Sequence, residues 1–142
     1  MNEEIIRRLR EKGCKITPQR RAVIDALLNL PKFPAALDIL NYVRRANPDV
    51  GLDTVYRNLN LLMDMGIVNQ INLTGKDGKV FELALSGHHH HSICLGCGEA
   101  KCLDYCPVDE KDLRKSAGPN FHIVGHSFEI YGYCQKCGPN RC

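Results

Sequence analysis

Residues 51–68 read GLDTVYRNLNLLMDMGIV, and the spacing of their apolar side chains predicts a helix that ends in a tight turn. Four of these side chains recur at the three- and four-residue spacing of one helix face, namely Leu52, Val55, Leu59 and Leu62. We expect Asp53 or Thr54 to cap the helix, because short polar side chains accept hydrogen bonds from its first N–H groups. Gly66 lies where a glycine commonly stops a helix. The stretch therefore predicts a helix over 52–65.

The segments on either side of this helix predict further helices and a hairpin. A short helix ends at Gly13, a second begins at Thr17-Pro18, and a third covers 36–43. After the quoted stretch, the β-rich runs IVNQINL and KVFELAL flank TGKDG, whose Asp-Gly pair is typical of a hairpin turn. Three or four short helices followed by a hairpin favour a winged helix-turn-helix domain, which we assign to residues 1–85.

A winged helix-turn-helix is a DNA-binding fold, and helix 52–65 would be its recognition element. The side chains expected to contact bases and phosphates are Lys15, Gln19, Arg20, Thr54, Tyr56, Arg57 and Lys76. Asn58 belongs to the same polar helix face. The alternative is a helical core with a solvated charged face, because residues 1–85 carry 13 Lys and Arg against 10 Asp and Glu, a net charge of only +3.

The composition of the chain is that of a globular protein, with 44% hydrophobic and 25% charged residues among 142. No apolar run approaches the roughly 20 residues that span a bilayer. The start, MNEEIIRRLREKG, lacks the apolar segment of a secretory signal, so we expect a cytoplasmic protein. Cysteines stay reduced in the cytoplasm, and cysteine pairs there favour metal or redox sites over structural disulfides.

Residue types that ligate metals concentrate in the second part of the chain. Seven of the eight cysteines and all six histidines follow Ser86, and residues 86–142 carry 6 Lys and Arg against 6 Asp and Glu, a net charge of zero. This shift in composition predicts a domain boundary. We expect a hinge at 86–88 and a metal-binding domain at 89–142.

Two CxxC motifs in this part have the spacing of a zinc site. Their cysteines are Cys94, Cys97, Cys134 and Cys137, with 36 residues between the motifs. Four thiolates suit tetrahedral Zn²⁺, and a two-residue spacer lets one tight turn direct both sulfurs to one ion. A thiol redox pair and unliganded buried cysteines are the alternatives. The intervening residues leave room for a strand, a helix over 108–117 and the strand HSFEIYGY, whose ends zinc would hold together.

Four consecutive histidines, His88 to His91, precede the first CxxC motif. If they lie on a strand, their side chains alternate between its faces, so His89 and His91 share one face while His88 and His90 share the other. One run could thus serve two metal sites. Further candidate ligands are Glu82, Cys102, Asp109 and His126. A solvated polar loop is the alternative, and an expression tag is disfavoured because tags are longer and lie at a terminus.

Several motifs in chain order resemble the ferric uptake regulator superfamily: ITPQRRAVIDAL, GLDTVYRNLNLLMDMGIV, VFEL ahead of HHHH, the CxxC motif at Cys94, and IYGYCQKC. They cover almost the whole chain. The resemblance implies an α+β fold in which an N-terminal winged helix-turn-helix domain precedes a small C-terminal α/β dimerisation domain with structural zinc. It further implies a homodimeric, metal-responsive transcription factor, usually a repressor, that binds AT-rich pseudopalindromic double-stranded DNA.

The resemblance also implies three metal sites. Structural Zn²⁺ falls on Cys94, Cys97, Cys134 and Cys137. The regulatory site between the domains falls on Glu82, His89, His91 and, as a further candidate, Cys102. The additional site falls on His88, His90, Asp109 and His126.

Two positions depart from the pattern of the family. Phe33 stands where many relatives have a histidine ligand of the regulatory site, and a phenyl ring cannot ligate. Cys102 stands where many have a carboxylate, and a thiolate favours Zn²⁺ over Fe²⁺ or Mn²⁺. We therefore expect Fe²⁺ or Zn²⁺ as the regulatory ion, with Mn²⁺ as a third candidate. Cys102 and Cys106 could instead form a redox pair.

These expectations combine into one function, that of a metal-dependent repressor, not an enzyme, of metal-homeostasis or oxidative-stress genes. Metal between the wing and the dimerisation domain would set the separation of two recognition helices in successive major grooves. The alternatives are a peroxide- or thiol-redox-sensing regulator of the same family, a zinc-dependent interaction module, and a metallohydrolase. A hydrolase needs an open zinc position and a general base, yet the sequence has no HExxH-type motif.

Overall fold

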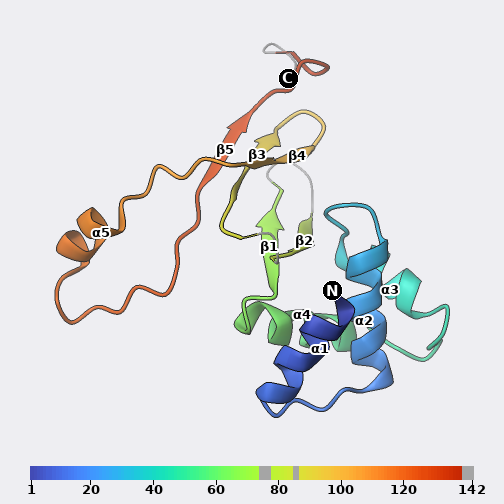
Figure 1. Cartoon of the computed structure of the whole chain (residues 1–142). Helices are drawn as coiled ribbons and strands as arrows, with labels where there is room; N and C mark the ends of the chain where they lie inside the picture. Colours follow the sequence, from blue (N-terminus) through green and yellow to red (C-terminus); the bar gives the residue numbers. More distant parts are fainter. Residues whose placement is uncertain (74–77, 85–86, 139–142) are drawn as a thin grey trace. The chain divides into compact units, whose positions relative to one another are not determined.

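The computed structural model describes residues 1–73, 78–84 and 87–138. The chain is a mixed α+β protein that divides into two compact units, Met1–Gly87 and His88–Cys142 (Figure 1). The division lies within the segment 86–88 that the sequence suggests as a linker. No helix in the described part of the chain is both long enough and apolar enough to cross a membrane.

The first unit consists of four helices followed by a hairpin (Figure 1). Its elements are α1 (Asn2–Glu11), α2 (Pro18–Asn29), α3 (Ala36–Val43), α4 (Leu52–Asp64), β1 (Val68–Asn72) and β2 (Lys79–Leu83). Helix α2 packs against the other three helices, and β1 pairs antiparallel with β2 from Val68↔Leu83 to Asn72↔Lys79. This is the order of elements expected for a winged helix-turn-helix. The predicted hairpin turn and Lys76 lie outside the described residues.

The helix ends follow local chemistry, with one correction to the sequence prediction. Thr17 caps α2 by accepting a hydrogen bond from the Arg20 N–H at 3.2 Å, and proline occupies the first turn as expected. The prediction that Asp53 or Thr54 caps α4 is wrong, because the helix already begins at Leu52 with Gly51 as its N-cap. Gly66 adopts φ 68°, the left-handed conformation that ends a helix.

One apolar cluster holds the first unit together. Val55, Leu59 and Leu62 of α4 are fully buried in it with Phe81 of β2, and the cluster includes side chains from all four helices. Burying each such side chain contributes about 1.5–3 kcal/mol. Leu52, the fourth member of the predicted apolar stripe, is 37% exposed and lies outside this core. The cluster fixes α4 and the hairpin as one body.

The second unit is a three-stranded sheet with one helix. Its elements are β3 (His90–Cys94), β4 (Ala100–Leu103), α5 (Glu110–Ala117) and β5 (Glu129–Gly132), and the strand order is β4-β3-β5. Strand β3 pairs antiparallel with β4 and parallel with β5. Among its described residues, only His90, His91, Ile93 and Cys94 are buried. Such a core is thin, and two of its four members are polar.

Residues 104–128 form an arm between β4 and β5, and α5 lies within it (Figure 1). The helix begins two residues later than predicted, because Asp109 is its N-cap rather than its second residue. None of its residues is buried. Within the described part of the chain, α5 packs against no other helix or strand.

Candidate metal centres and nucleic-acid interface

The two CxxC motifs meet at one end of the sheet. Parallel pairing of β3 with β5 aligns Cys94 with Gly132, so the turn after each strand carries its cysteines to the same place. The four sulfurs lie within 4.8 Å of one another, and those of Cys97 and Cys134 are 3.9 Å apart. Sulfurs around tetrahedral zinc stand about 3.8 Å apart, given Zn–S bonds of about 2.3 Å. The spacing therefore fits one zinc ion.

The backbone of the first CxxC turn is shaped around these sulfurs. A Cβ at Gly96 would lie 2.7 Å from the Cys137 sulfur, so only glycine fits there. The Cys97 backbone N–H and then that of Cys134 stabilise the Cys94 thiolate and lower its pKa to about 6. A hydrogen bond with Cys134 raises the pKa of Cys137 to about 12. Since metal-ligating sulfurs are thiolates, an ion here would displace the proton held at Cys137.

His89, His91 and Cys102 form a second group within the second unit. The two imidazole centroids are 5.0 Å apart, and His91 pairs with Cys102 across β3 and β4. The ligand atoms of all three lie within 4.8 Å of one another. Glu82 lies on β2 in the first unit, where it is buried and accepts from Asn69 Nδ2 at 3.4 Å. Its membership of the regulatory site therefore stays a prediction.

Phe33, the first departure from the family pattern, lies in the loop before α3. It adopts φ 64°, a left-handed conformation that is costly for a bulky residue. The Lys32 ammonium lies 5.8 Å from the centre of its ring. Its carbon ring offers no ligand atom.

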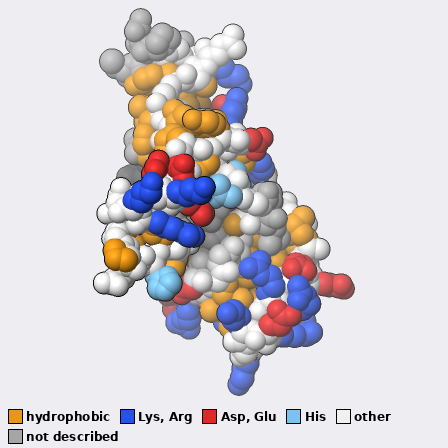
Figure 2. All heavy atoms as spheres, turned by 60° about the vertical axis from the view of Figure 1, so that its left-hand side comes forward, with side chains coloured by type: hydrophobic (Ala, Val, Ile, Leu, Met, Phe, Trp, Pro, Cys, Tyr) orange, Lys and Arg blue, Asp and Glu red, His pale blue; other side chains and the backbone are white. Residues whose placement is uncertain are grey.

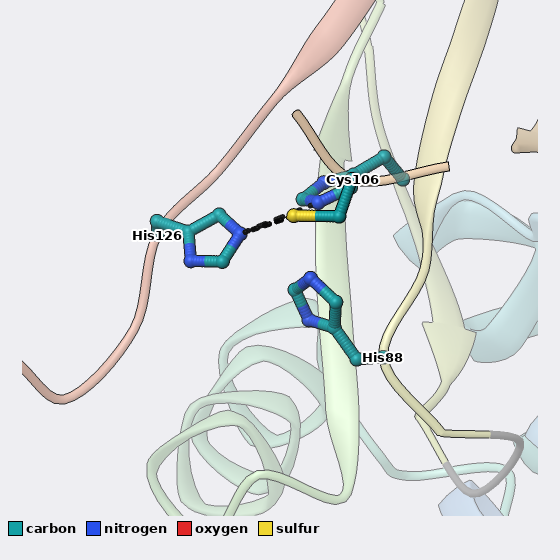
Figure 3. A group of neighbouring side chains, drawn as sticks. His88, Cys106 and His126 are labelled. Carbon is teal, nitrogen blue, oxygen red and sulfur yellow. Dashed lines mark hydrogen bonds between the residues drawn. The ribbon is translucent and has the colours of Figure 1, made fainter. Parts of the chain in front are cut away.

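The third group differs from its predicted composition. His88, His90 and His126 come together as predicted, and their ring centroids are 4.6–5.1 Å apart. The fourth member is Cys106, whose sulfur lies 3.3 Å from His126 Nε2 (Figure 3). Asp109 instead caps α5 by accepting from the Lys111 N–H at 2.8 Å.

The sequence suggests Cys106 only as a redox partner of Cys102. The structure assigns these two cysteines to different groups of ligand-type residues. The position of Cys106 depends on the path of the chain after β4, which no local pattern reports. The alternation of the four histidines, in contrast, follows the predicted pairing, although β3 itself begins only at His90.

Most of the predicted DNA contacts lie around one concave surface of the first unit. A cavity of about 610 Å³ is lined by side chains from α2, α4 and the loop 46–50, including Thr17, Gln19, Arg20, Thr54 and Arg57. Lys15 is exposed just before α2. Tyr56 contacts Phe81 edge to face, with ring centroids 6.4 Å apart.

Asn58 has a structural part in this surface. It is 5% exposed, its Oδ1 accepts from Arg20 Nε at 2.9 Å, and its amide donates to the Thr54 carbonyl at 2.9 Å. Arg20 also donates to the backbone carbonyl of Lys15. Asn58 is thus not one of the exposed polar residues of the helix face, but a buried link between α2 and α4 that orients Arg20.

The comparisons with known proteins agree with this architecture. The ferric uptake regulator family matches residues 11–131. The ferric uptake regulation protein of Staphylococcus epidermidis is 38% identical over 135 residues, which cover 94% of each chain.

Two solved structures have the same fold. The Helicobacter pylori ferric uptake regulator, described with three functional metal binding sites, superposes with a TM-score of 0.72 at 24% identity, covering 96% of this chain and 93% of that one. The Pseudomonas aeruginosa regulator with manganese gives 0.64 at 30% identity, covering 89% and 95%.

Proposed function

Because this chain belongs to the ferric uptake regulator family, we propose that it is a metal-dependent repressor that binds DNA as a homodimer. Members of the family are transcription regulators and not enzymes, and this chain is one of these regulators. The observation that supports metal control best is the grouping of eleven ligand-type residues of the second unit into two sets of four and one set of three.

DNA binding by the first unit is supported by the concave surface between α2 and α4. Arg20 and Arg57 would contact phosphates there, and Thr54 at the start of α4 would lie near base edges. Arg57 is well exposed, and its only described ion pair is a loose 3.9 Å contact with Asp53. Breaking an exposed pair of this kind costs little free energy, so phosphate can replace the carboxylate. AT-rich palindromic operators are the expected sites.

Homodimer formation is supported by apolar surface on the second unit. Four large apolar side chains of its sheet and adjoining turns are exposed: Leu95, Ile130, Tyr131 and Tyr133. Figure 2 shows hydrophobic side chains gathered over this part of the molecule. On the arm, Phe121 and Val124 are 65% and 100% exposed. Apolar surface of this extent commonly marks an interface, and we propose a second copy of the chain as its partner.

For the regulatory site we propose His89, His91 and Cys102 of the second unit together with Glu82 of the first. A divalent ion at this site would supply a cross-link between the two units. Two recognition helices could then reach major grooves about 34–36 Å apart. The Cys102 thiolate favours Zn²⁺ over Fe²⁺ or Mn²⁺. We propose metal-homeostasis genes as the targets.

A second candidate function is redox sensing by the same site. Cys102 is exposed and lies among imidazoles, and an exposed cysteine near such groups can be oxidised. Oxidation of its sulfur would remove one ligand and release the ion. Peroxide- or thiol-responsive regulation of oxidative-stress genes would follow.

DNA affinity measured with and without regulatory metal tests the proposal. An operator is first selected from random DNA with metal-loaded protein, and fluorescence anisotropy then gives its Kd. Family-type coupling of about 1–3 kcal/mol predicts that mild chelation weakens binding about 5–150-fold. His89→Ala/His91→Ala should weaken it equally, whereas His122→Ala, at an exposed histidine outside the three groups, should not. Equal affinity in all states, with the cysteine site still loaded, would refute metal control.

A further inference from the structure

The group at the base of the 104–128 arm differs from the site that the family resemblance implies. We infer that Cys106, rather than Asp109, completes a four-ligand site with His88, His90 and His126, that this site takes a zinc-class ion, and that it anchors the arm to the sheet. The inference deepens the proposed function, since it assigns an ion class and a structural role to the additional metal site of a metal-dependent regulator.

The distances fit tetrahedral coordination. With Zn–N bonds of about 2.0–2.1 Å and Zn–S bonds of about 2.3 Å, two nitrogens stand about 3.3 Å apart and a nitrogen and a sulfur about 3.6 Å apart. Here His126 Nε2 lies 3.3 Å from His90 Nε2 and 3.3 Å from the Cys106 sulfur. Figure 3 shows the labelled side chains of His88, Cys106 and His126 directed toward one another. One ion could therefore contact all of them.

Asp109 already has another task. Its carboxylate caps α5, and withdrawing a cap to ligate an ion would cost about 0.5–2 kcal/mol. Cys106 has no comparable role, since its other described contact is a 4.0 Å approach to the Val108 carbonyl. Cys106 is thus available as a ligand, whereas Asp109 serves as the helix cap.

The four ligands come from three places along the chain. His88 and His90 stand at the start of β3, whereas Cys106 and His126 stand near the two ends of the arm. Because α5 packs against no other described element of its own chain, coordination at the base would be the main restraint on the arm within one copy of the protein. The ion would hold both ends of the arm against the start of β3.

The ligand set also selects the ion. Three imidazoles and one thiolate suit Zn²⁺, and Co²⁺ as its spectroscopic substitute, better than Mn²⁺ or Mg²⁺, which prefer oxygen. Replacing the expected carboxylate with sulfur therefore moves the preference of the site away from hard ions.

Cobalt spectroscopy on the full-length chain tests the ligand assignment. In a Cys102→Ser background with zinc in the cysteine site, added Co²⁺ should give a sulfur-to-cobalt charge-transfer band from Cys106. Cys106→Ser should abolish this band and weaken Co²⁺ binding at least about 100-fold, beyond the usual 10–100-fold effect of an outer-shell change. Asp109→Asn should keep both. A band that survives Cys106→Ser, or absence of the band from the background protein, would overturn the assignment.

A chemical swap separates loss of a ligand from damage to the fold. Cys106→Asp should restore Co²⁺ binding without the charge-transfer band and should improve Mn²⁺ binding relative to Zn²⁺. If Cys106→Asp binds Co²⁺ as weakly as Cys106→Ser does, residue 106 is not a ligand.

Limited proteolysis tests the anchoring role. Trypsin sites in α5 follow Lys111, Arg114 and Lys115. If opening of the arm requires loss of the ion, zinc at 100 times its Kd should slow cleavage there up to about 100-fold. The slowing should vanish in Cys106→Ser and persist in Asp109→Asn. Unchanged cleavage in the zinc-loaded wild type would overturn the anchor. Both readouts are independent of DNA, so failure of the proposed function would leave them intact.

Discussion

The two units of this chain are stabilised in different ways. The first buries a continuous apolar cluster from four helices and a hairpin, and its polar groups lie mostly outside that cluster. The second buries only His90, His91, Ile93 and Cys94 among its described residues, and it contains eleven ligand-type residues in two groups of four and one group of three. A thin core of this kind commonly depends on metal. The contrast leads to the prediction that the first unit folds on hydrophobic burial and the second on metal coordination.

The strongest test of this contrast is removal of one cysteine ligand. Cys134→Ser should unfold the second unit, because structural zinc contributes apparent binding free energies of about 10–16 kcal/mol in small zinc domains. Amide resonances of β3, β4 and β5 should collapse while those of α1–α4 stay dispersed. Cys14→Ser, a half-buried cysteine outside the ligand groups, is the control. Intact resonances of β3 in Cys134→Ser would contradict the contrast.

A cavity in the first unit should have the opposite effect. Leu59→Ala removes a fully buried side chain from α4 and should lower the free energy of unfolding of this unit by about 2–5 kcal/mol. Urea titration followed by NMR measures each unit separately. Zinc content should stay the same. Leu37→Ala, at a 61% exposed site on α3, should change little, and an equal loss in both variants would mean that burial at Leu59 is not what matters.

The link between α2 and α4 offers a smaller test within the first unit. Asn58→Ala leaves the Arg20 guanidinium and the Thr54 carbonyl without the partner that Asn58 supplies, which should cost about 1–3 kcal/mol. Freed from its partner, Arg20 should also contribute less to DNA affinity. Asn60→Ala, on the exposed side of the same helix, is the matched control. Stability equal to that of the control would remove the structural role of Asn58.

The smallest expected effect is that of the α5 cap. Asp109→Ala should destabilise this helix by about 1 kcal/mol, visible as faster hydrogen exchange of its amides. Co²⁺ affinity of the neighbouring group should not change. Asp104→Ala, at an exposed aspartate outside the helix, controls for the lost charge. A fall in Co²⁺ affinity with no change in exchange would return Asp109 to the set of ligands.

Local patterns predicted the first unit well because periodicity and caps report local structure. Neighbouring residues alone predicted the apolar face of α4, the helix start at Thr17-Pro18 and the helix end at Gly66. The predicted start of α4 at Leu52 is confirmed, but the predicted capping residue was wrong, because Gly51 caps without a side chain and so leaves no polar signature.

The second unit was harder to predict because its contacts join distant segments. Strand alternation correctly sorted the four histidines into two pairs. The arm brings Cys106 beside His126, 20 residues later, and no periodic signal predicts that return. Asp109 offered the expected chemistry at nearly the expected position, yet α5, which begins four residues after Cys106, uses it as its N-cap.

The parallel pairing of β3 with β5 also has a consequence for how the protein is made. Cys94 and Cys134 lie 40 positions apart in the chain, so the sheet and the four-sulfur site can close only after nearly all of the second unit has been synthesised. Parallel pairing between distant segments forms slowly, because the entropy of closing the intervening loop is lost before the stabilising contacts form. On the ribosome, the first unit can fold as soon as β2 emerges, whereas capture of a zinc ion by all four sulfurs would have to await Cys137. The zinc available at that stage of synthesis would then decide how much of the newly made second unit matures.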